Sequence, residues 1–231
     1  MKTIYLVTGA AGHLGNTVVN MLVDESKFVR ALVLPCDKGA QQIPENVEVF
    51  IGDICNKESI RSAFTTDEDE QLIVIHTAGI VTIASRYQKA VYDVNVFGTR
   101  NVVELCSENE VKKLIYVSSV HALPELSNKH IIGEIDFFDP ENVIGLYAKT
   151  KSEATALVLN AGNEGLDVTV VHPSGICGPY DYGNGHTTQL LLDFYKGTLT
   201  AGIKGGYDFV ARTGSFSRNV CGIGRKSQSH L

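Results

Sequence analysis

The sequence predicts an α/β fold in which helices cover both faces of a doubly wound parallel sheet. Six short apolar runs rich in β-branched residues alternate with stretches of helical periodicity. The runs are nearly continuous in Val, Ile and Leu, which is typical of strands that are buried on both faces. A glycine-rich segment joins the first run directly to the first helical stretch. Together these observations favour one large domain of the Rossmann type.

The expected elements follow one another in a regular order. The strands are predicted at Ile4–Val7, Phe28–Leu34, Val47–Phe50, Leu72–Ile75, Leu114–Val117 and Val168–Val171. The helices are predicted at about residues 13–25, 57–64, 86–108, 142–162 and 187–196. In the fourth helix a stripe at helical spacing is expected to be buried, and it consists of Val143, Leu146, Thr150, Ala154, Leu157 and Val158.

Composition and charge narrow the class of protein. The chain has 231 residues, of which 44% are apolar and 20% charged, with a net charge of −6. The acidic balance argues against a nucleic-acid surface, and the run Asp67–Glu70 is expected to be a solvated loop rather than a metal site. No apolar run has the length of a membrane span, and the first strand begins near Thr3, so a cytoplasmic location is expected. The five cysteines lack metal-ligand spacing and are expected to be reduced thiols.

The segment Thr8–Gly15 predicts a dinucleotide phosphate site. Its three glycines, Gly9, Gly12 and Gly15, follow a strand and open a helix. Such a turn lets backbone N–H groups approach a pyrophosphate at the helix N-terminus, where the partial charge is positive. The structural alternative is a tight joint between strand and helix with no ligand.

A Tyr, a Lys and a Ser make up the second candidate site. Tyr147 and Lys151 are four residues apart on one helix face, and a nearby cation favours the phenolate form of a tyrosine. The strand Leu114–Val117 ends in Ser118 and Ser119, which a parallel sheet brings to the edge where ligands bind. Such a set can exchange a proton with a carbonyl or an alcohol.

At this point the chain resembles the short-chain dehydrogenase/reductase superfamily. Within it, the resemblance is closest to the extended branch of NAD(P)-dependent epimerase/dehydratase and dihydroflavonol-reductase-like proteins, over residues 3 to about 210. The motifs that carry the resemblance occur in the family's order, namely Thr8–Gly15, Gly52–Ile54, His76–Gly79, Asn95–Thr99, Ser118–Ser119, Tyr147–Lys151, His172–Pro173 and Gly178–Pro179.

The resemblance implies a role for each matching position. Tyr147 would be the general acid/base, Lys151 would lower its pKa and hold the nicotinamide ribose, and Ser119, rather than Ser118, would orient the substrate oxygen. The implied cofactor-binding residues are Gly9, Ala11, Gly12, His13, Leu14, Gly15, Leu34, Asp53, Ile54, Thr77, Ala78, Gly79, Asn95, Lys151, His172 and Pro173. Asp53 would hold the adenine amino group, although an Asp that closes a turn is the alternative. Asn95 would brace the catalytic helix, and no metal is implied.

The choice between NADP and NAD depends on the residue that ends the second strand. An acidic residue there binds the ribose 2′-hydroxyl, whereas an Arg accepts a 2′-phosphate. This chain has Leu34, with Lys38 just beyond it, which slightly favours NADP. Asp37 is the feature that would support NAD.

The chain departs from the family after Val210. Relatives continue into further elements of a substrate domain, whereas here residues 211–231 are rich in Gly, Ser and Arg without periodicity and are expected to be disordered or a surface strap. A shifted reading frame or altered gene end would produce such a junction. We therefore expect a cofactor domain at 1–178, a partial and incomplete substrate-binding region at 179–210 and an atypical tail at 211–231.

Three functions are compatible with these observations. The favoured one is an NAD(P)-dependent oxidoreductase that reduces a carbonyl or oxidises an alcohol of a small molecule. A nucleotide-sugar epimerase or dehydratase needs further acid/base residues, for which His121, Glu125 and His130 are candidates. A catalytically impaired NAD(P)-binding protein is the third. Members of the family often pair through the helices at 95–106 and 147–159, so the resemblance also implies a homodimer.

Overall fold

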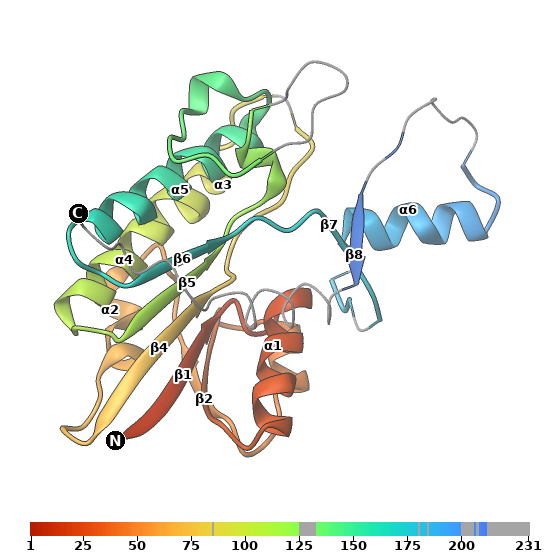
Figure 1. Ribbon diagram of the computed structural model, residues 1–231. Helices are drawn as coiled ribbons and strands as arrows, with labels where there is room; N and C mark the ends of the chain where they lie inside the picture. The colour runs from red at the N-terminus through yellow and green to blue at the C-terminus, as the bar shows by residue number, and fades with distance from the viewer. Residues whose placement is uncertain are drawn as a thin grey trace.

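The computed structural model describes residues 1–84, 86–124, 133–179, 181–183, 185–199, 206 and 208–211. Its main sheet has six parallel strands in the order β3-β2-β1-β4-β5-β6 (Figure 1). The strands are β1 (Lys2–Thr8), β2 (Phe28–Val33), β3 (Glu48–Ile51), β4 (Glu70–His76), β5 (Lys113–Val117) and β6 (Val168–Val171). All six expected strands are present, and this order confirms the doubly wound α/β fold.

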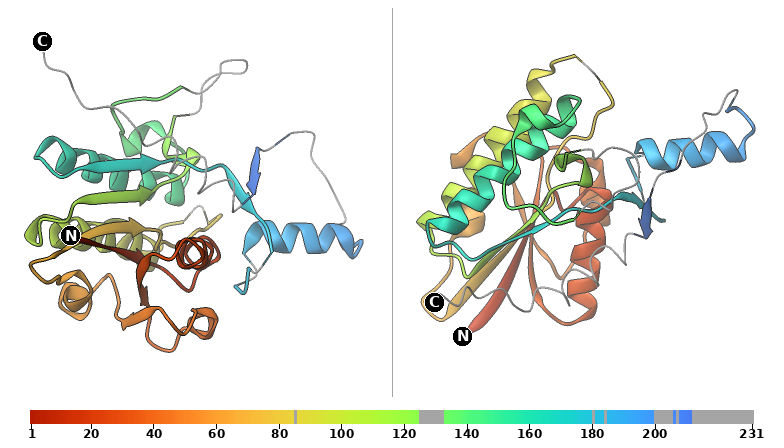
Figure 2. Two further views of the ribbon diagram at one scale, coloured as in Figure 1. Left: turned by 60° about the horizontal axis from the view of Figure 1, so that its bottom comes forward. Right: turned by 45° about the horizontal axis from the view of Figure 1, so that its top comes forward.

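Helices cover both faces of this sheet (Figure 2). Helix α1 (His13–Asp24) packs on one face, where Val18, Val19 and Leu22 join a core formed with β1 and β2. Helices α4 (Thr99–Glu108) and α5 (Leu146–Asn163) lie side by side on the other face. The larger core lies beneath them and includes Tyr116 and Phe64, both without exposed surface.

Two predicted helices are interrupted. The segment expected as one helix at 86–108 consists of α3 (Lys89–Tyr92), the π-helix η3 (Asp93–Gly98) and α4. The segment at 57–64 is α2 (Lys57–Ile60) followed by the 3₁₀-helix η2 (Arg61–Phe64). Other 3₁₀-helices are η1 (Lys38–Gln42), η4 (Val120–Ala122) and η5 (Pro140–Asn142).

The helix expected at 142–162 begins four residues later than predicted, at Leu146. Gly145 precedes it with a φ of +99°, a conformation that stops helical hydrogen bonding toward the N-terminus and favours glycine. Val143 is buried, as expected, but lies outside the helix. The buried stripe of α5 is formed by Thr150, Ala154 and Val158.

A small unit follows the main sheet. Strands β7 (Gly175–Cys177) and β8 (Phe209–Ala211) form a two-stranded parallel sheet that the sequence did not predict. Helix α6 (His186–Tyr195), at its predicted place, lies beside them and away from the main sheet (Figures 1 and 2). Residues 212–231 of the expected tail lie outside the described residues. Among the helices that are described, none is long and apolar enough to cross a membrane.

Candidate active site

The glycine loop after β1 is packed closely against the end of β4. Gly9 has a φ of +66°, and a Cβ there would lie 2.7 Å from the Cα of Ala78. A Cβ at Gly15 would overlap the carbonyl oxygen of Gly9 and lie 2.9 Å from Oγ1 of Thr77. Gly12 is exposed and donates its N–H to the oxygen of Gly9 at 3.0 Å. The loop therefore needs glycine at these positions to bring its backbone this close to the sheet.

The N-terminus of α1 fits a cofactor pyrophosphate. Its N-cap residue is Gly12, no side chain caps the helix, and its first turn holds no acidic residue. The first N–H groups of a helix lack intrahelical partners, so an anion is a favourable ligand for them. His13 and Leu14 are half-buried in this first turn, and Nε2 of His13 is buried without a hydrogen-bond partner in the described structure. Ala11 is buried in the core beneath the loop.

Asp53 and Ile54 lie beyond the carboxyl end of β3. One carboxylate oxygen of Asp53 accepts a hydrogen bond from the Cys55 N–H at 2.9 Å, so this residue closes a turn, as in the alternative interpretation. The side chain of Ile54 is 6% exposed and packs into the core, where a Cβ on Gly98 would lie 2.6 Å from it. Its backbone oxygen accepts from Asn101 at 2.7 Å. The turn thus has a fixed shape at the cofactor edge of the sheet.

Leu34 follows the end of β2, and its side chain is exposed. Asp37 and Lys38 lie at the start of η1, where Oδ1 of Asp37 accepts a hydrogen bond from the Gly39 N–H at 2.9 Å. The Lys38 side chain is exposed. Asp37 is therefore partly used in capping η1, while the Lys38 ammonium has no such role among the described contacts.

Asn95 joins the residues after β4 to the candidate catalytic helix. Its Oδ1 accepts from the Ile80 N–H at 2.8 Å, and its Nδ2 donates to the Ile80 oxygen and to Oγ1 of Thr150, both at 3.0 Å. Thr150 in turn donates to the backbone oxygen of Tyr147 at 2.8 Å. Asn95 is 1% exposed, so these bonds are made away from water. The structure thus ties Asn95 to the first turn of α5.

The two serines after β5 have different surroundings. The hydroxyl of Ser118 is buried and hydrogen-bonded to Oγ1 of Thr155 on α5 at 2.7 Å. The side chain of Ser119 accepts from the His121 N–H at 3.3 Å at the start of η4, against which α5 packs. Ser118 therefore holds the helix against the sheet, whereas Ser119 faces the segment that lies beside Tyr147.

Tyr147 and Lys151 occupy successive turns of α5. The half-buried Tyr147 ring lies edge-on to the His121 ring, with a centroid distance of 6.0 Å. Lys151 is 5% exposed, and its ammonium donates to the Val117 oxygen at 2.9 Å. Burial lowers the pKa of Lys151 to about 8. A Cβ at Gly79 would lie 3.5 Å from this ammonium, so the glycine leaves space beside the charge.

His172 and Pro173, after β6, pack against the serine segment. Nδ1 of His172 lies 2.9 Å from the Ser119 backbone oxygen, an acceptor, so this nitrogen carries the proton. The imidazole stacks on Phe138 with a centroid distance of 5.3 Å, and burial lowers its pKa. The Pro173 oxygen accepts from the Val120 N–H at 3.1 Å. Both predicted residues therefore support the backbone of Ser119.

The structure adds one residue that the sequence analysis did not single out, His76 at the end of β4. It has no exposed surface. Its Nδ1 lies 2.6 Å from Oγ1 of Thr8, and its Nε2 lies 3.0 Å from Oγ1 of Thr99. Thr99 donates its only hydroxyl proton to the Asn95 oxygen at 2.7 Å, so it must accept from Nε2–H of the histidine. The neutral Nε2–H tautomer of His76 thus links β1 to the segment that holds Asn95.

This buried histidine makes the fold sensitive to acid. Burial lowers the pKa of His76 from 6.5 to about 3, so between these values the unfolded chain binds more protons than the folded one. Stability therefore falls as pH falls below about 6.5. We expect His76 to make the protein about 2 kcal/mol less stable at pH 5 than at pH 7, and His76→Asn to remove that difference. Urea unfolding of both proteins at the two pH values measures it, and equal slopes with pH would contradict the assignment.

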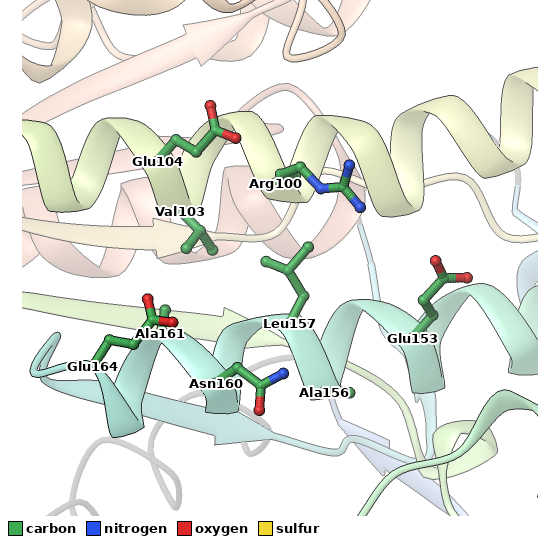
Figure 3. A pocket seen from close by; sticks show the side chains of 9 residues that line it. All are labelled: Arg100, Val103, Glu104, Glu153, Ala156, Leu157, Asn160, Ala161 and Glu164. Carbon is green, nitrogen blue, oxygen red and sulfur yellow. The ribbon is translucent and has the colours of Figure 1, made fainter.

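Some predicted residues are not part of this arrangement. His121 lies beside Tyr147, but Glu125 and His130 lie outside the described residues. Figure 3 shows a groove on the outer side of α4 and α5, lined by Arg100, Val103, Glu104, Glu153, Ala156, Leu157, Asn160, Ala161 and Glu164. No candidate catalytic residue lines this groove. Within the described ranges, no three His, Cys, Asp or Glu residues are placed to hold a metal ion.

Comparison with known proteins places this arrangement in a family. The chain is 34% identical over 209 residues to sterol demethylase protein B of Methylococcus capsulatus, covering 89% of this chain and 61% of that protein. It is 30% identical to human 3 beta-hydroxysteroid dehydrogenase type 7, covering 100% of this chain and 63% of that protein. The structure of Thermus thermophilus UDP-glucose 4-epimerase in complex with NAD has the same fold, with a TM-score of 0.73, 22% identity, and coverage of 90% of this chain and 70% of that one.

The chain thus spans about 60% of the length of these two curated relatives. The family model described as 3-beta hydroxysteroid dehydrogenase/isomerase matches residues 6–204, from β1 to beyond α6. This match covers the glycine loop, the serine segment and the Tyr147–Lys151 helix, and it confirms the resemblance to extended short-chain dehydrogenases/reductases. The chain belongs to the 3-beta hydroxysteroid dehydrogenase/isomerase family.

Proposed function

We propose that this chain is an NAD(P)-dependent oxidoreductase that interconverts a secondary alcohol and a ketone. The observation that carries the proposal is that one short helix segment and one strand end bring three groups together. Lys151 is buried against the end of β5, Tyr147 lies one turn before it, and Ser119 leaves the same strand end. The glycine loop, with its uncapped helix N-terminus, lies at the same edge of the sheet.

Each of the three side chains has a distinct task in this proposal. The cofactor supplies hydride transfer when it is bound. Tyr147 donates its phenolic proton to the carbonyl oxygen during reduction and takes it back during oxidation. The positive charge of Lys151 stabilises the phenolate, and its ammonium holds a ribose hydroxyl. Ser119 donates a hydrogen bond to the substrate oxygen and so fixes it near the phenol.

The proposed cofactor residues are those predicted from the sequence. Gly9, Gly12 and Gly15 let the backbone approach the pyrophosphate, and Asp53 with Ile54 flanks the adenine. Thr77 and Ala78 lie beside β1, where Thr77 donates to the Thr8 oxygen at 2.7 Å, and form the wall next to Gly79. We favour NADP because Lys38 is exposed beyond Leu34 and one oxygen of Asp37 is used to cap η1.

An apolar substrate suits the described surroundings better than a sugar nucleotide. The loop after β4 exposes Ile80, Val81, Ile83 and Tyr87, at 36%, 60%, 85% and 67% of their surface. Exposed apolar side chains gathered in one loop are typical of a binding surface. The two relatives named above carry sterol and hydroxysteroid in their names. We therefore propose a hydroxylated sterol-like or similarly apolar molecule as the substrate class.

A panel of substrates tests this function. NADH and NADPH oxidation should be followed with apolar ketones, ketosteroids and small aldehydes, and reduction of NAD⁺ and NADP⁺ with the matching alcohols. We expect turnover with the apolar ketones and tighter binding of NADPH than of NADH. Cofactor binding without turnover on any substrate would instead support an impaired binding protein. Conversion of UDP-glucose without net change of cofactor would support an epimerase.

We also propose a homodimer formed through α4 and α5. The groove between these helices has an apolar floor that includes Val103 and Leu157, and charged side chains such as Arg100 and Glu153 at its margins (Figure 3). Such a combination is suited to a second copy of the same surface. Light scattering at micromolar concentration should give twice the mass of one chain, and a monomer would count against the pairing.

A further inference from the structure

Tyr116 is a buried tyrosine at the centre of the sheet, directly behind the candidate catalytic helix. It has no exposed surface and lies opposite His76 in the parallel pairing of β4 and β5. The two rings stack with a centroid distance of 5.5 Å and an angle of 28°. Because His76 is fixed by Thr8 and Thr99, the ring of Tyr116 has a fixed support on this side.

The hydroxyl of Tyr116 contacts the ammonium of Lys151. The distance between Nζ and the phenolic oxygen is 3.3 Å, and the ammonium also lies 4.9 Å from the ring centroid. An ammonium has three N–H donors and no acceptor, so the phenolic oxygen accepts this hydrogen bond. A buried tyrosine hydroxyl ordinarily has such a partner, and the ring face attracts the same cation.

Two of the three ammonium donors therefore have acceptors on β5. These are the hydroxyl of Tyr116 and the backbone oxygen of Val117 at 2.9 Å. The described structure gives the third donor no acceptor, and Gly79 leaves space beside the charge. A lysine side chain has many rotamers, and fixing two donors removes most of that freedom before any ligand binds.

We propose that Tyr116 is a positioning residue whose hydroxyl holds the Lys151 ammonium in place and keeps it charged at neutral pH. The inference rests on the proposed function for the role of Lys151, but the contact itself does not. Removing the hydroxyl leaves the charge with a single backbone acceptor in a buried place. The neutral amine then becomes more favourable, and the ammonium no longer has one fixed direction.

The other groups that face Lys151 do not replace this contact. His76 from β4 and His172 after β6 both have pKa values lowered by burial, so they are neutral where Lys151 titrates. Burial raises the pKa of Tyr116 above its usual range, so its hydroxyl stays neutral too. Tyr147, on the same helix, is the remaining titratable neighbour. No carboxylate forms an ion pair with Lys151 in the described part of the chain.

The experiment is a direct titration of Lys151 by NMR in cofactor-free, lysine-labelled protein. The spectrum of Lys151→Met assigns the resonance, and all variants are made in the Tyr147→Phe background so that the neighbouring phenol does not titrate. We expect a midpoint near pH 8 in the parent and a midpoint about one pH unit lower in Tyr116→Phe. Tyr5→Phe, which removes the hydroxyl of a half-buried tyrosine on β1, should leave the midpoint unchanged.

A second variant and a second readout complete the test. Tyr116→Met fills the space without an acceptor and should lower the midpoint in the same direction, should Tyr116→Phe fail to fold. In otherwise wild-type protein, the alkaline loss of NADPH affinity should begin about one pH unit lower in Tyr116→Phe. An unchanged or raised Lys151 midpoint overturns this inference. Absence of cofactor binding in the wild type would overturn the proposed function and leave the titration result standing.

Discussion

Replacing Tyr147 by Phe should abolish turnover while the cofactor still binds. The change removes only the phenolic oxygen, which in the proposed reaction is the group that exchanges a proton with the substrate. General acid/base catalysis contributes about 10²- to 10⁴-fold, so kcat should fall by roughly that factor. Cofactor affinity should hold because the glycine loop and Lys151 are unchanged. Steady-state kinetics on the most active ketone, together with a fluorescence titration of NADPH, measure both quantities.

A matched control is available in Tyr195→Phe. Tyr195 ends α6 and is 89% exposed, so loss of its hydroxyl should alter neither kcat nor stability. If Tyr147→Phe kept wild-type turnover, Tyr147 would not be the proton donor. If it lost cofactor binding together with turnover, its role would be structural, since the Thr150 hydroxyl already holds the backbone oxygen of this residue.

The fold was predictable because its strands are nearly continuous apolar runs, which parallel sheets with two covered faces require. All six strands and their alternation with helices followed from that pattern. Strands β7 and β8 were missed because each has three residues and pairs with a partner more than thirty positions away. The break before α4 was missed as well, because hydrophobic periodicity cannot distinguish a π-helix from the α-helical turns beside it.

The late start of α5 had a visible signal. Gly145 stands directly before the helix, and a glycine at a predicted helix boundary deserved more weight than the apolar spacing of Val143 and Leu146. In the candidate site, the sequence pattern named the residues near the ligand but not those behind them. His76 and Tyr116 lie within apolar strands, and only the pairing of β4 with β5 brings their rings together. A polar residue at equivalent ends of adjacent strands was the signal that sequence reasoning passed over.

Replacing Gly15 by Ala should remove cofactor binding and destabilise the fold. The added Cβ would overlap the Gly9 carbonyl oxygen, and it would lie 2.8 Å from the Gly9 carbonyl carbon and 2.9 Å from Oγ1 of Thr77. Two of these three atoms are backbone and cannot rotate away, so α1 must move from the sheet and open the phosphate loop. Overpacking of this kind costs about 1–3 kcal/mol, and the N–H groups that face the pyrophosphate lose their alignment. Calorimetric titration with NADPH and urea unfolding measure the two effects.

Gly133→Ala is the matched control for this last change. No atom lies within 4 Å of a Cβ built at Gly133, so the same chemical substitution should leave binding and stability unchanged. If Gly15→Ala lost stability but bound NADPH like the wild type, the loop would be a packing joint between strand and helix, and the cofactor would have to bind elsewhere. If it lost binding with little loss of stability, the close approach of backbone to pyrophosphate would be the reason for glycine at this position, since packing alone does not require an empty helix N-terminus.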